Sequence, residues 1–115
     1  MSERTSRVGE AIKEHLAMTL EKDISDPRLD MVTLTDVEVS PDLRHAHVYY
    51  SVLGGKRKRR DCEQALERAR GCLRSSVAKS LGLKFTPELT FIADRSIDTG
   101  ERIDRLINRY KEEGG

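Results

Sequence analysis

The residues from Ala46 to Val52 constrain the fold more than any other stretch, because apolar and polar side chains alternate strictly along them. One parity holds Ala46, Val48, Tyr50 and Val52. The other parity holds His47, Tyr49 and Ser51. This period of two is typical of a half-buried antiparallel strand. Since Ser40-Pro41-Asp42 just before it is rich in turn-forming residues, a β-hairpin is expected here.

The first strand of this hairpin is expected over residues 31–39, but its alternation slips. Val32 and Leu34 share one parity, and Val37 and Val39 share the other. A β-bulge near Asp36 would turn both halves toward the same face. Burial of the strand on both sides would also explain the pattern, so both interpretations stay open.

Two amphipathic helices are expected around the hairpin. In the first, from Thr5 to about Ile24, an apolar residue recurs every fourth position: Val8, Ile12, Leu16, Leu20 and Ile24. Ser25-Asp26-Pro27 ends this helix, because proline disfavours the helical conformation of the residue before it.

The second helical pattern runs from Arg59 to Leu81, after a loop over residues 54–58. Gly71 lies in its middle, where glycine costs about 1 kcal/mol relative to alanine. Beside Ala69, this glycine indicates either close packing or a break between two shorter helices. Gly82 follows the pattern as a C-terminal cap.

Two further elements complete the expected fold. Pro87 precedes a third strand from Leu89 to Asp94. A short helix begins near Thr99, marked by Ile103, Leu106, Ile107 and Tyr110. A three-stranded sheet with the helices on one face would bury the apolar stripes, which predicts a two-layer α+β architecture. We expect a single domain over residues 1–111, with residues 112–115 frayed.

The composition indicates a small core and a polar exterior. Of the 115 residues, 37% are hydrophobic, 36% are charged and 4% are aromatic. No apolar run reaches the roughly 18 residues of a membrane span, and no signal-peptide pattern begins the chain, so a cytoplasmic protein is expected. Ten helical positions would hold Cys62 and Cys72 about 15 Å apart, too far for a disulfide. Both are expected to be small buried residues.

The net charge of +1 hides a strong asymmetry along the chain. Residues 54–84 hold 10 basic and 3 acidic side chains, whereas the flanking segments are net acidic. Five consecutive cations, Lys56, Arg57, Lys58, Arg59 and Arg60, lead into the second helix. At 100° per residue, Arg68, Arg70, Arg74 and Lys79 project away from the apolar stripe. Such a face can bind a phosphate backbone without reading base sequence.

The same charges also fit a solvated helix face. Glu67 precedes Arg70 by three residues, and Glu63 lies near the five-cation run, so part of the charge can be paired internally. Aromatic residues for base stacking are scarce. Tyr49 is the strand aromatic that could face outward, while Tyr50 and Phe91 are expected in the core. Recognition by shape and phosphate position is therefore predicted.

No catalytic or metal-binding pattern is present. His45 and His47 share a strand face, but no third ligand has suitable spacing. An acidic cluster of Asp94, Asp98, Glu101 and Asp104 is explained by capping and by pairing with Arg102 and Arg105. Phosphate-loop, dinucleotide-binding, nucleophile-elbow and zinc-ligand motifs are absent. No enzyme activity, cofactor or metal is expected.

Several strings in the chain match a known family. The most specific is TDVEVSPDLRHAHVYYSVLG, from Thr35 to Gly54. The supporting matches are Arg4, Arg7-Val8, Asp26-Pro27-Arg28, Ala69-Arg70-Gly71, Leu73-Arg74, Pro87-Glu88-Leu89-Thr90-Phe91, Asp94, Ser96 and Arg102-Ile103. Together they cover nearly the whole chain and resemble the ribosome-binding factor A family of small-subunit assembly factors.

This resemblance implies a KH-like (type II-like) RNA-binding fold of order αββααβ. Its two central helices are expected to be kinked near Ala69–Gly71. The chain has no GXXG loop of the usual KH type, so Ala69-Arg70-Gly71 would stand in its place.

The resemblance also implies a monomeric, non-enzymatic factor that binds free small (30S) ribosomal subunits through 16S rRNA. Such a factor assists late maturation and rRNA processing, supports growth in the cold, and has an assembly GTPase as a partner in some organisms. The expected RNA-binding residues are Arg4, Arg7, Arg28, Arg44, His45, Lys56, Arg57, Lys58, Arg59, Arg60, Arg70, Arg74 and Lys79. Arg28 and Arg44 can equally anchor the acidic turns at Asp26 and Asp42.

Two other functions stay open. One is a general chaperone of structured RNA, and the other is a protein-interaction module for an acidic partner. A chaperone should bind many RNAs similarly, whereas an assembly factor should prefer the assembled small subunit to naked rRNA.

Overall fold

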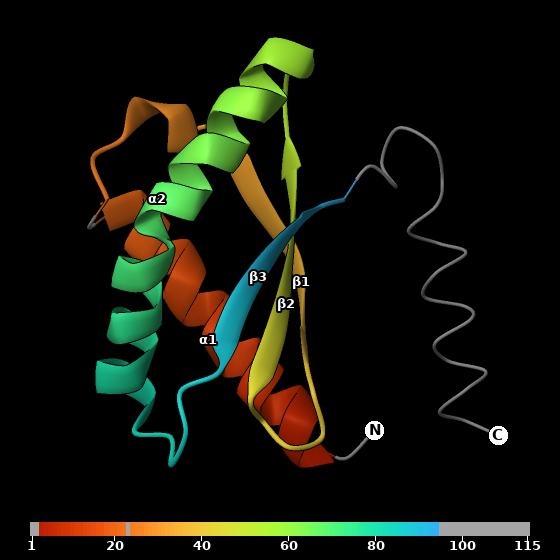
Figure 1. Cartoon of the computed structure of the whole chain (residues 1–115), viewed down its shortest axis with the longest axis vertical. Helices are drawn as coiled ribbons and strands as arrows, with labels where there is room; N and C mark the ends of the chain where they lie inside the picture. The colour runs from red at the N-terminus through yellow and green to blue at the C-terminus, as the bar shows by residue number, and fades with distance from the viewer. Residues whose placement is uncertain (1–2, 23, 95–115) are drawn as a thin grey trace, which may run out of the picture.

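The computed structural model of the chain describes residues 3–22 and 24–94 (Figure 1). In chain order, the described elements are helix α1 (Glu3–Lys22), the short 3-10 helix η1 (Pro27–Leu29), strands β1 (Val32–Val39) and β2 (His45–Val52), helix α2 (Lys56–Leu81) and strand β3 (Glu88–Ala93). The expected C-terminal helix and frayed end lie outside the described residues. None of the described helices is long and apolar enough to cross a membrane.

The three strands form one sheet with β2 in the centre. β1 pairs with β2 antiparallel, as the predicted hairpin requires, and β3 pairs with β2 in parallel. A parallel pair needs a crossover connection, which α2 provides. Both helices cover the same face of the sheet (Figure 1). The two-layer α+β class predicted from the sequence is therefore confirmed.

β1 contains a bulge, which was one of the two interpretations that its sequence left open. The register with β2 steps from Leu34 directly to Asp36, which leaves Thr35 as the extra residue. Leu34 and Val37 consequently both face the helices, although their parities differ. The Thr35 hydroxyl donates a hydrogen bond of 2.9 Å to the carboxylate of Asp94, which is buried at the end of β3. The bulge in β1 is thus linked to the end of β3, the strand at the opposite edge of the sheet.

Tyr49 does not offer the exposed ring that the alternation suggested. It lies on the sheet face away from the helices, but only 7% of the residue is exposed. Its hydroxyl donates a hydrogen bond of 3.2 Å to Glu38 Oε2. Because β2 is the central strand, side chains from β1 and β3 flank Tyr49 on both sides, among them Ile92. A lone strand pattern cannot reveal this shielding.

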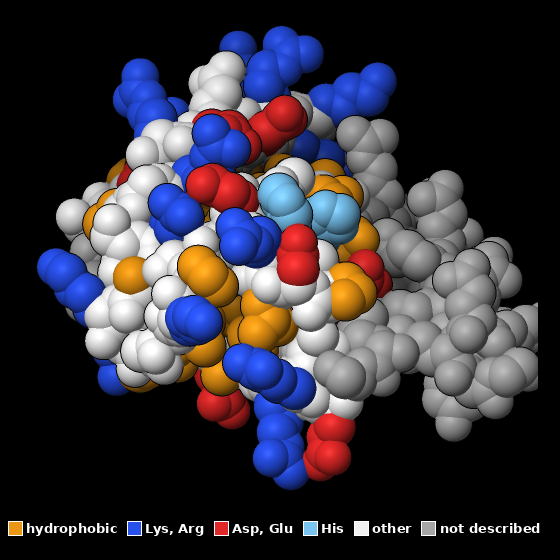
Figure 2. Space-filling model, turned by 60° about the horizontal axis from the view of Figure 1, so that its bottom comes forward, with side chains coloured by type: hydrophobic (Ala, Val, Ile, Leu, Met, Phe, Trp, Pro, Cys, Tyr) orange, Lys and Arg blue, Asp and Glu red, His pale blue; other side chains and the backbone are white. Residues whose placement is uncertain are grey.

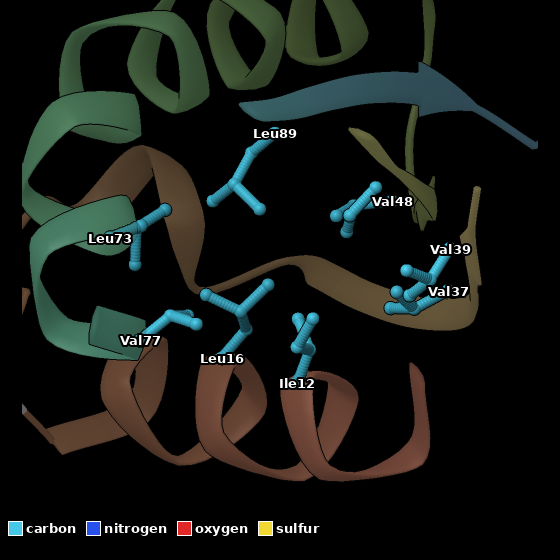
Figure 3. Close-up of a cluster of buried hydrophobic side chains, with 9 residues drawn as sticks. Ile12, Leu16, Val37, Val39, Val48, Leu73, Val77 and Leu89 are labelled. Carbon is cyan, nitrogen blue, oxygen red and sulfur yellow. The ribbon is translucent and has the colours of Figure 1, made fainter. Parts of the chain in front are cut away.

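The helices bury their apolar stripes in two adjoining clusters. The larger cluster, shown in Figure 3, consists of Ile12, Leu16, Val37, Val39, Ala46, Val48, Leu73, Val77 and Leu89. The smaller cluster consists of Leu29, Tyr50, Ala65 and Leu66. In Figure 3, Ile12 and Leu16 of α1 point toward the sheet, and Leu73 reaches the same space from α2. Burial of each such side chain contributes about 1.5–3 kcal/mol.

α2 is one continuous helix, whereas the sequence suggested a loop up to residue 58 and a break near Gly71. Gly71 is exposed, and a Cβ atom there would meet nothing within 4 Å. Neither close packing nor a break therefore explains this glycine. Leu66 and Leu73 are fully buried on either side of it, and their burial outweighs the cost of about 1 kcal/mol for one glycine. One described helix stands where the order αββααβ has two.

The sequence correctly predicted the cap at the carboxyl end of α2 and the burial of one of its two cysteines. Gly82 adopts the left-handed conformation, with φ 58° and ψ 32°, and caps the helix as expected. Cys62 is buried as expected, whereas Cys72 is exposed beside Gly71, and neither forms a disulfide. Cys72 lies on the solvent side because the apolar stripe of α2 passes through Leu73 instead.

η1 ties the segment after α1 to the start of α2. Asp26 caps η1 by accepting a 3.0 Å hydrogen bond from the backbone N–H of Arg28, and its carboxylate also binds the Arg28 guanidinium at 2.7 Å. The Arg28 side-chain hydrogen bond, followed by this backbone hydrogen bond, lowers the pKa of Asp26 from 3.8 to about 2. The Cys62 thiol of α2 donates to the Arg28 carbonyl at 2.9 Å, and burial raises the pKa of this thiol.

The two glycines in the helices provide a matched test of how closely α1 approaches β1. An alanine Cβ at Gly9 would lie 2.8 Å from the Val37 carbonyl oxygen, whereas Gly71 has open space. Gly71→Ala should stabilise the protein by about 0.5–1 kcal/mol. Gly9→Ala gains the same helix propensity but should destabilise overall, because overpacking costs about 1–3 kcal/mol. Urea unfolding followed by circular dichroism checks both, and equal stabilisation by the two variants would contradict the close contact.

The contact between Asp26 and Arg28 predicts how the stability of the protein depends on pH. Because the folded-state pKa of Asp26 is depressed, the stability it contributes is present above about pH 4 and is lost as the pH falls toward 2. Arg28→Gln should raise the pKa of Asp26 toward 3.8, since the hydrogen bond from the Arg28 side chain, the largest cause of the shift, is removed. The carboxyl-carbon chemical shift in an NMR titration measures this pKa. Arg7→Gln, which breaks only the distant Arg7–Glu3 pair, should leave the titration unchanged.

Candidate nucleic-acid interface

The five-cation run forms the beginning of α2. The side chains of Lys56, Arg57, Lys58 and Arg60 are exposed, and Arg59 is half-buried. The first turn contains no acidic residue, and the N-cap Gly55 provides no side-chain hydrogen bond. Cations at a helix amino end oppose the macrodipole, at about 0.3–1 kcal/mol each. The run therefore combines backbone N–H groups that lack helical partners with concentrated positive charge, an arrangement suited to phosphate.

The outer face of α2 continues the positive surface. Arg68, Arg70 and Lys79 are exposed, as the helical wheel predicted. Arg70 lies 3.6 Å from the Glu67 carboxylate, so this pair partly neutralises itself, and both side chains are about half exposed. From Lys56 to Lys79 the helix extends about 35 Å at 1.5 Å per residue. The cations of α2 are thus spread along its length and lie on more than one side of the helix.

Arg74 has a structural role that the helical wheel did not indicate. Its guanidinium donates hydrogen bonds to the carbonyl of Thr86 at 2.9 Å and of Pro87 at 3.3 Å, and lies 3.4 Å from the Glu88 carboxylate. These contacts hold the loop between α2 and β3 against the helix. The wheel describes one helix in isolation, so it could not show that this loop folds back over Arg74.

The turn between β1 and β2 meets this loop at one end of the molecule. Arg44 places its guanidinium carbon 4.5 Å from the centroid of the Phe85 ring, and Lys84 Nζ lies 5.6 Å from the same centroid. Asp42 accepts hydrogen bonds from the Ser40 hydroxyl and the Arg44 backbone N–H, and these lower its pKa. The Arg44 side chain therefore stacks on an aromatic ring, while its backbone serves the acidic turn.

Sequence reasoning missed Phe85. It was not assigned a place in the core or on the surface, yet 46% of the residue is exposed. Its position outside the predicted strand, between Lys84 and Pro87, was the available signal. Figure 2 views the molecule from this end and shows basic side chains around a group of hydrophobic ones, with histidine side chains nearby.

The remaining candidate cations are distributed over both ends of the molecule. Arg4 is exposed in α1, and Arg7 pairs with Glu3 at 2.7 Å. Arg28 is bound to Asp26, and together with Lys58 it lines a cavity of about 240 Å³. Figure 1 places η1 and the beginning of α2 at one end, and the beginning of α1 with the β1–β2 turn at the other. The thirteen predicted residues therefore do not form one patch.

The histidines show no metal site. His45 and His47 are exposed on β2, next to Glu88 and Glu38 in the register. Within residues 3–22 and 24–94, no group of three His, Cys, Asp or Glu side chains could hold a metal ion. His15 shares a 2.6 Å hydrogen bond with the Ser76 hydroxyl, so it joins α1 to α2.

Sequence comparison finds relatives along nearly the whole chain. The sequence model of the family described as Ribosome-binding factor A matches residues 4–107. Proteins of that name are 47% identical in Frankia casuarinae, 47% in Heliobacterium modesticaldum and 43% in Geobacter metallireducens. The alignments cover 95%, 94% and 100% of this chain, and 65%, 89% and 98% of the respective relatives.

Solved structures share the fold. The crystal structure of ribosome-binding factor A from Thermus thermophilus matches with a TM-score of 0.69 at 25% identity, covering 77% of this chain and 94% of that one. The solution NMR structure of a Thermotoga maritima protein gives 0.69 at 37% identity, covering 80% and 88%. A homology model of the Thermus thermophilus factor, fitted into a cryo-electron-microscopy map of a 30S complex, gives 0.65 at 25% identity, covering 79% and 96%. This chain belongs to the ribosome-binding factor A family.

Proposed function

We propose that this protein is a non-enzymatic, monomeric assembly factor that binds free small ribosomal subunits through 16S rRNA in the cytoplasm. It assists late maturation and rRNA processing and supports growth in the cold, and an assembly GTPase is its further partner. Family membership supports this proposal, as does the Thermus thermophilus relative fitted into a map of a 30S complex.

The observation that carries the proposal is the positive charge at the beginning of α2. Cations in the first turn oppose the helix macrodipole, and that turn contains no acidic residue, so helix stability gives no reason for them. Phosphate groups would offset the repulsion between these cations and the positive end of the helix macrodipole. They would also accept hydrogen bonds from the backbone N–H groups of the first turn that have no helical partner. We therefore assign the rRNA-facing surface to Lys56–Arg60 and the outer face of α2 with Arg70 and Lys79.

The other predicted RNA-binding residues fall into two groups, those with exposed side chains and those that already bind another part of the protein. Arg4 and His45 are exposed and remain proposed contacts, together with Arg7 and Arg44. Arg28 and Arg74 already bind Asp26 and the β3 loop, so we propose that they position neighbouring segments as well as contact RNA. Substituting Arg74 would disturb this loop, which makes exposed Arg68 and Arg70 better probes of binding.

Sedimentation distinguishes the proposed function from its two alternatives. The purified protein is centrifuged with free small subunits, large subunits and translating ribosomes at two salt concentrations. We expect selective pelleting with free small subunits that weakens at the higher salt concentration. Similar affinity for unrelated structured RNAs would indicate a general chaperone. Absence from all three pools, with the protein shown to be folded, would contradict the proposal.

Removal of charge from the beginning of α2 should separate binding from stability. Lys56→Gln/Arg57→Gln should weaken binding to free small subunits. The negative slope of the logarithm of the binding constant against the logarithm of the salt concentration should become shallower by about 0.7–0.9 per lost phosphate contact. The same variant should be as stable as the wild type or more stable, by up to about 1 kcal/mol, because two cations leave the macrodipole's positive end.

A matched control removes two charges from α1. Lys13→Gln/Lys22→Gln changes the net charge equally, outside the proposed surface, and should leave the salt slope unchanged. Equal loss of affinity in both double variants would show that net charge matters and that the beginning of α2 is not a specific contact.

A further inference from the structure

We propose that Phe85 is a stacking platform for an unpaired RNA base, with Arg44 and Lys84 binding the phosphates beside that base. This inference rests on the proposed function and adds the kind of RNA that the surface takes. Phe85 is the most exposed aromatic residue within residues 3–22 and 24–94, at 46%, while Tyr49 and Tyr50 are buried.

The ring is presented on a loop that is held in place from three sides. Arg74 of α2 binds the carbonyls of Thr86 and Pro87 directly after the ring. Pro87 itself is fully buried. The backbone N–H of Glu88 donates a 2.8 Å hydrogen bond to the Arg44 carbonyl, which joins the start of β3 to the start of β2. A ring held in this way loses little conformational freedom when a ligand stacks on it.

The charges around the ring favour a nucleic acid over an apolar partner. Arg44 and Lys84 lie within 6 Å of the ring centroid, and neither forms an ion pair with the part of the chain that the structure describes. Glu88 is engaged by Arg74, and the Asp42 carboxylate is engaged by Ser40 and the Arg44 N–H. Both cations now lie over the ring, so we infer that they turn their charges to the phosphates when a base stacks on Phe85.

Exposure alone would not single out Phe85, because scattered exposed apolar side chains are ordinary. Leu53, directly after the end of β2, is 75% exposed, but it is not aromatic and offers no face for stacking, so we propose no site there. An aromatic face flanked by cations is the arrangement by which proteins bind single-stranded nucleic acid. The sheet, whose tyrosines are buried, cannot serve this purpose.

The experiment compares Phe85→Leu, Phe85→Tyr and Leu53→Ala in the full chain. Each protein is titrated into a single-stranded RNA oligonucleotide that contains the fluorescent base 2-aminopurine, and separately into free small subunits. Phe85→Leu keeps the apolar volume and removes the stacking face, Phe85→Tyr keeps both, and Leu53→Ala controls for loss of exposed apolar surface. Thermal unfolding confirms that every variant is folded.

We expect stacking to quench 2-aminopurine fluorescence with wild type, Phe85→Tyr and Leu53→Ala, and the quench to be lost with Phe85→Leu. Affinity for small subunits should fall by about 5- to 150-fold in Phe85→Leu, since one stacked base contributes this factor. Phe85→Tyr should stay close to wild type.

Three outcomes would overturn the inference. Equal quenching and equal subunit affinity for Phe85→Leu and wild type would exclude stacking, while leaving the proposed function intact. If Phe85→Leu loses subunit binding but quenches the fluorescent base as the wild type does, Phe85 would contact a ribosomal protein. If the wild type fails to bind subunits, the proposed function fails by itself, and absence of quenching in the oligonucleotide titration then excludes stacking independently.

Discussion

The extra residue in β1 is the constraint on which the rest of the fold depends. Thr35 shifts the strand by one position, so Leu34 before it and Val37 after it face the same helices. A one-residue slip without the bulge would turn half of the strand to the other face of the sheet and leave one cluster incomplete. The hydrogen bond from Thr35 to Asp94 then links this irregularity to the end of β3.

The packed sheet in turn fixes where the two ends of α2 lie. Leu66 and Leu73 attach the helix to the sheet along its length, so its amino end projects with the five-cation run and its carboxyl end meets the loop of Phe85. For the RNA partner that we propose, the surface therefore offers two distinct features. One is a charged helix beginning, and the other is an aromatic ring between cations.

Several residues of α2 are difficult to explain by stability alone. The first turn carries cations where the macrodipole favours acids, and Gly71 occupies an exposed helical position without any packing need. Both features lower helix stability and both lie on the solvent face. Proteins retain such local conflicts mainly at functional sites, which agrees with assigning RNA contact to this face.

The sequence by itself determined the hairpin, the apolar stripes and the excess of cations between residues 54 and 84, and it offered the bulge as one of two interpretations. Periodicity, turn residues and local charge are properties of neighbouring residues, so they can be read along the chain. Only the tertiary structure decided which side chains are available. Arg74 is occupied by a loop 12 or 13 residues away, and Arg44 lies over Phe85 because two distant turns meet. Such contacts depend on how the elements pack, and no local pattern contains that information.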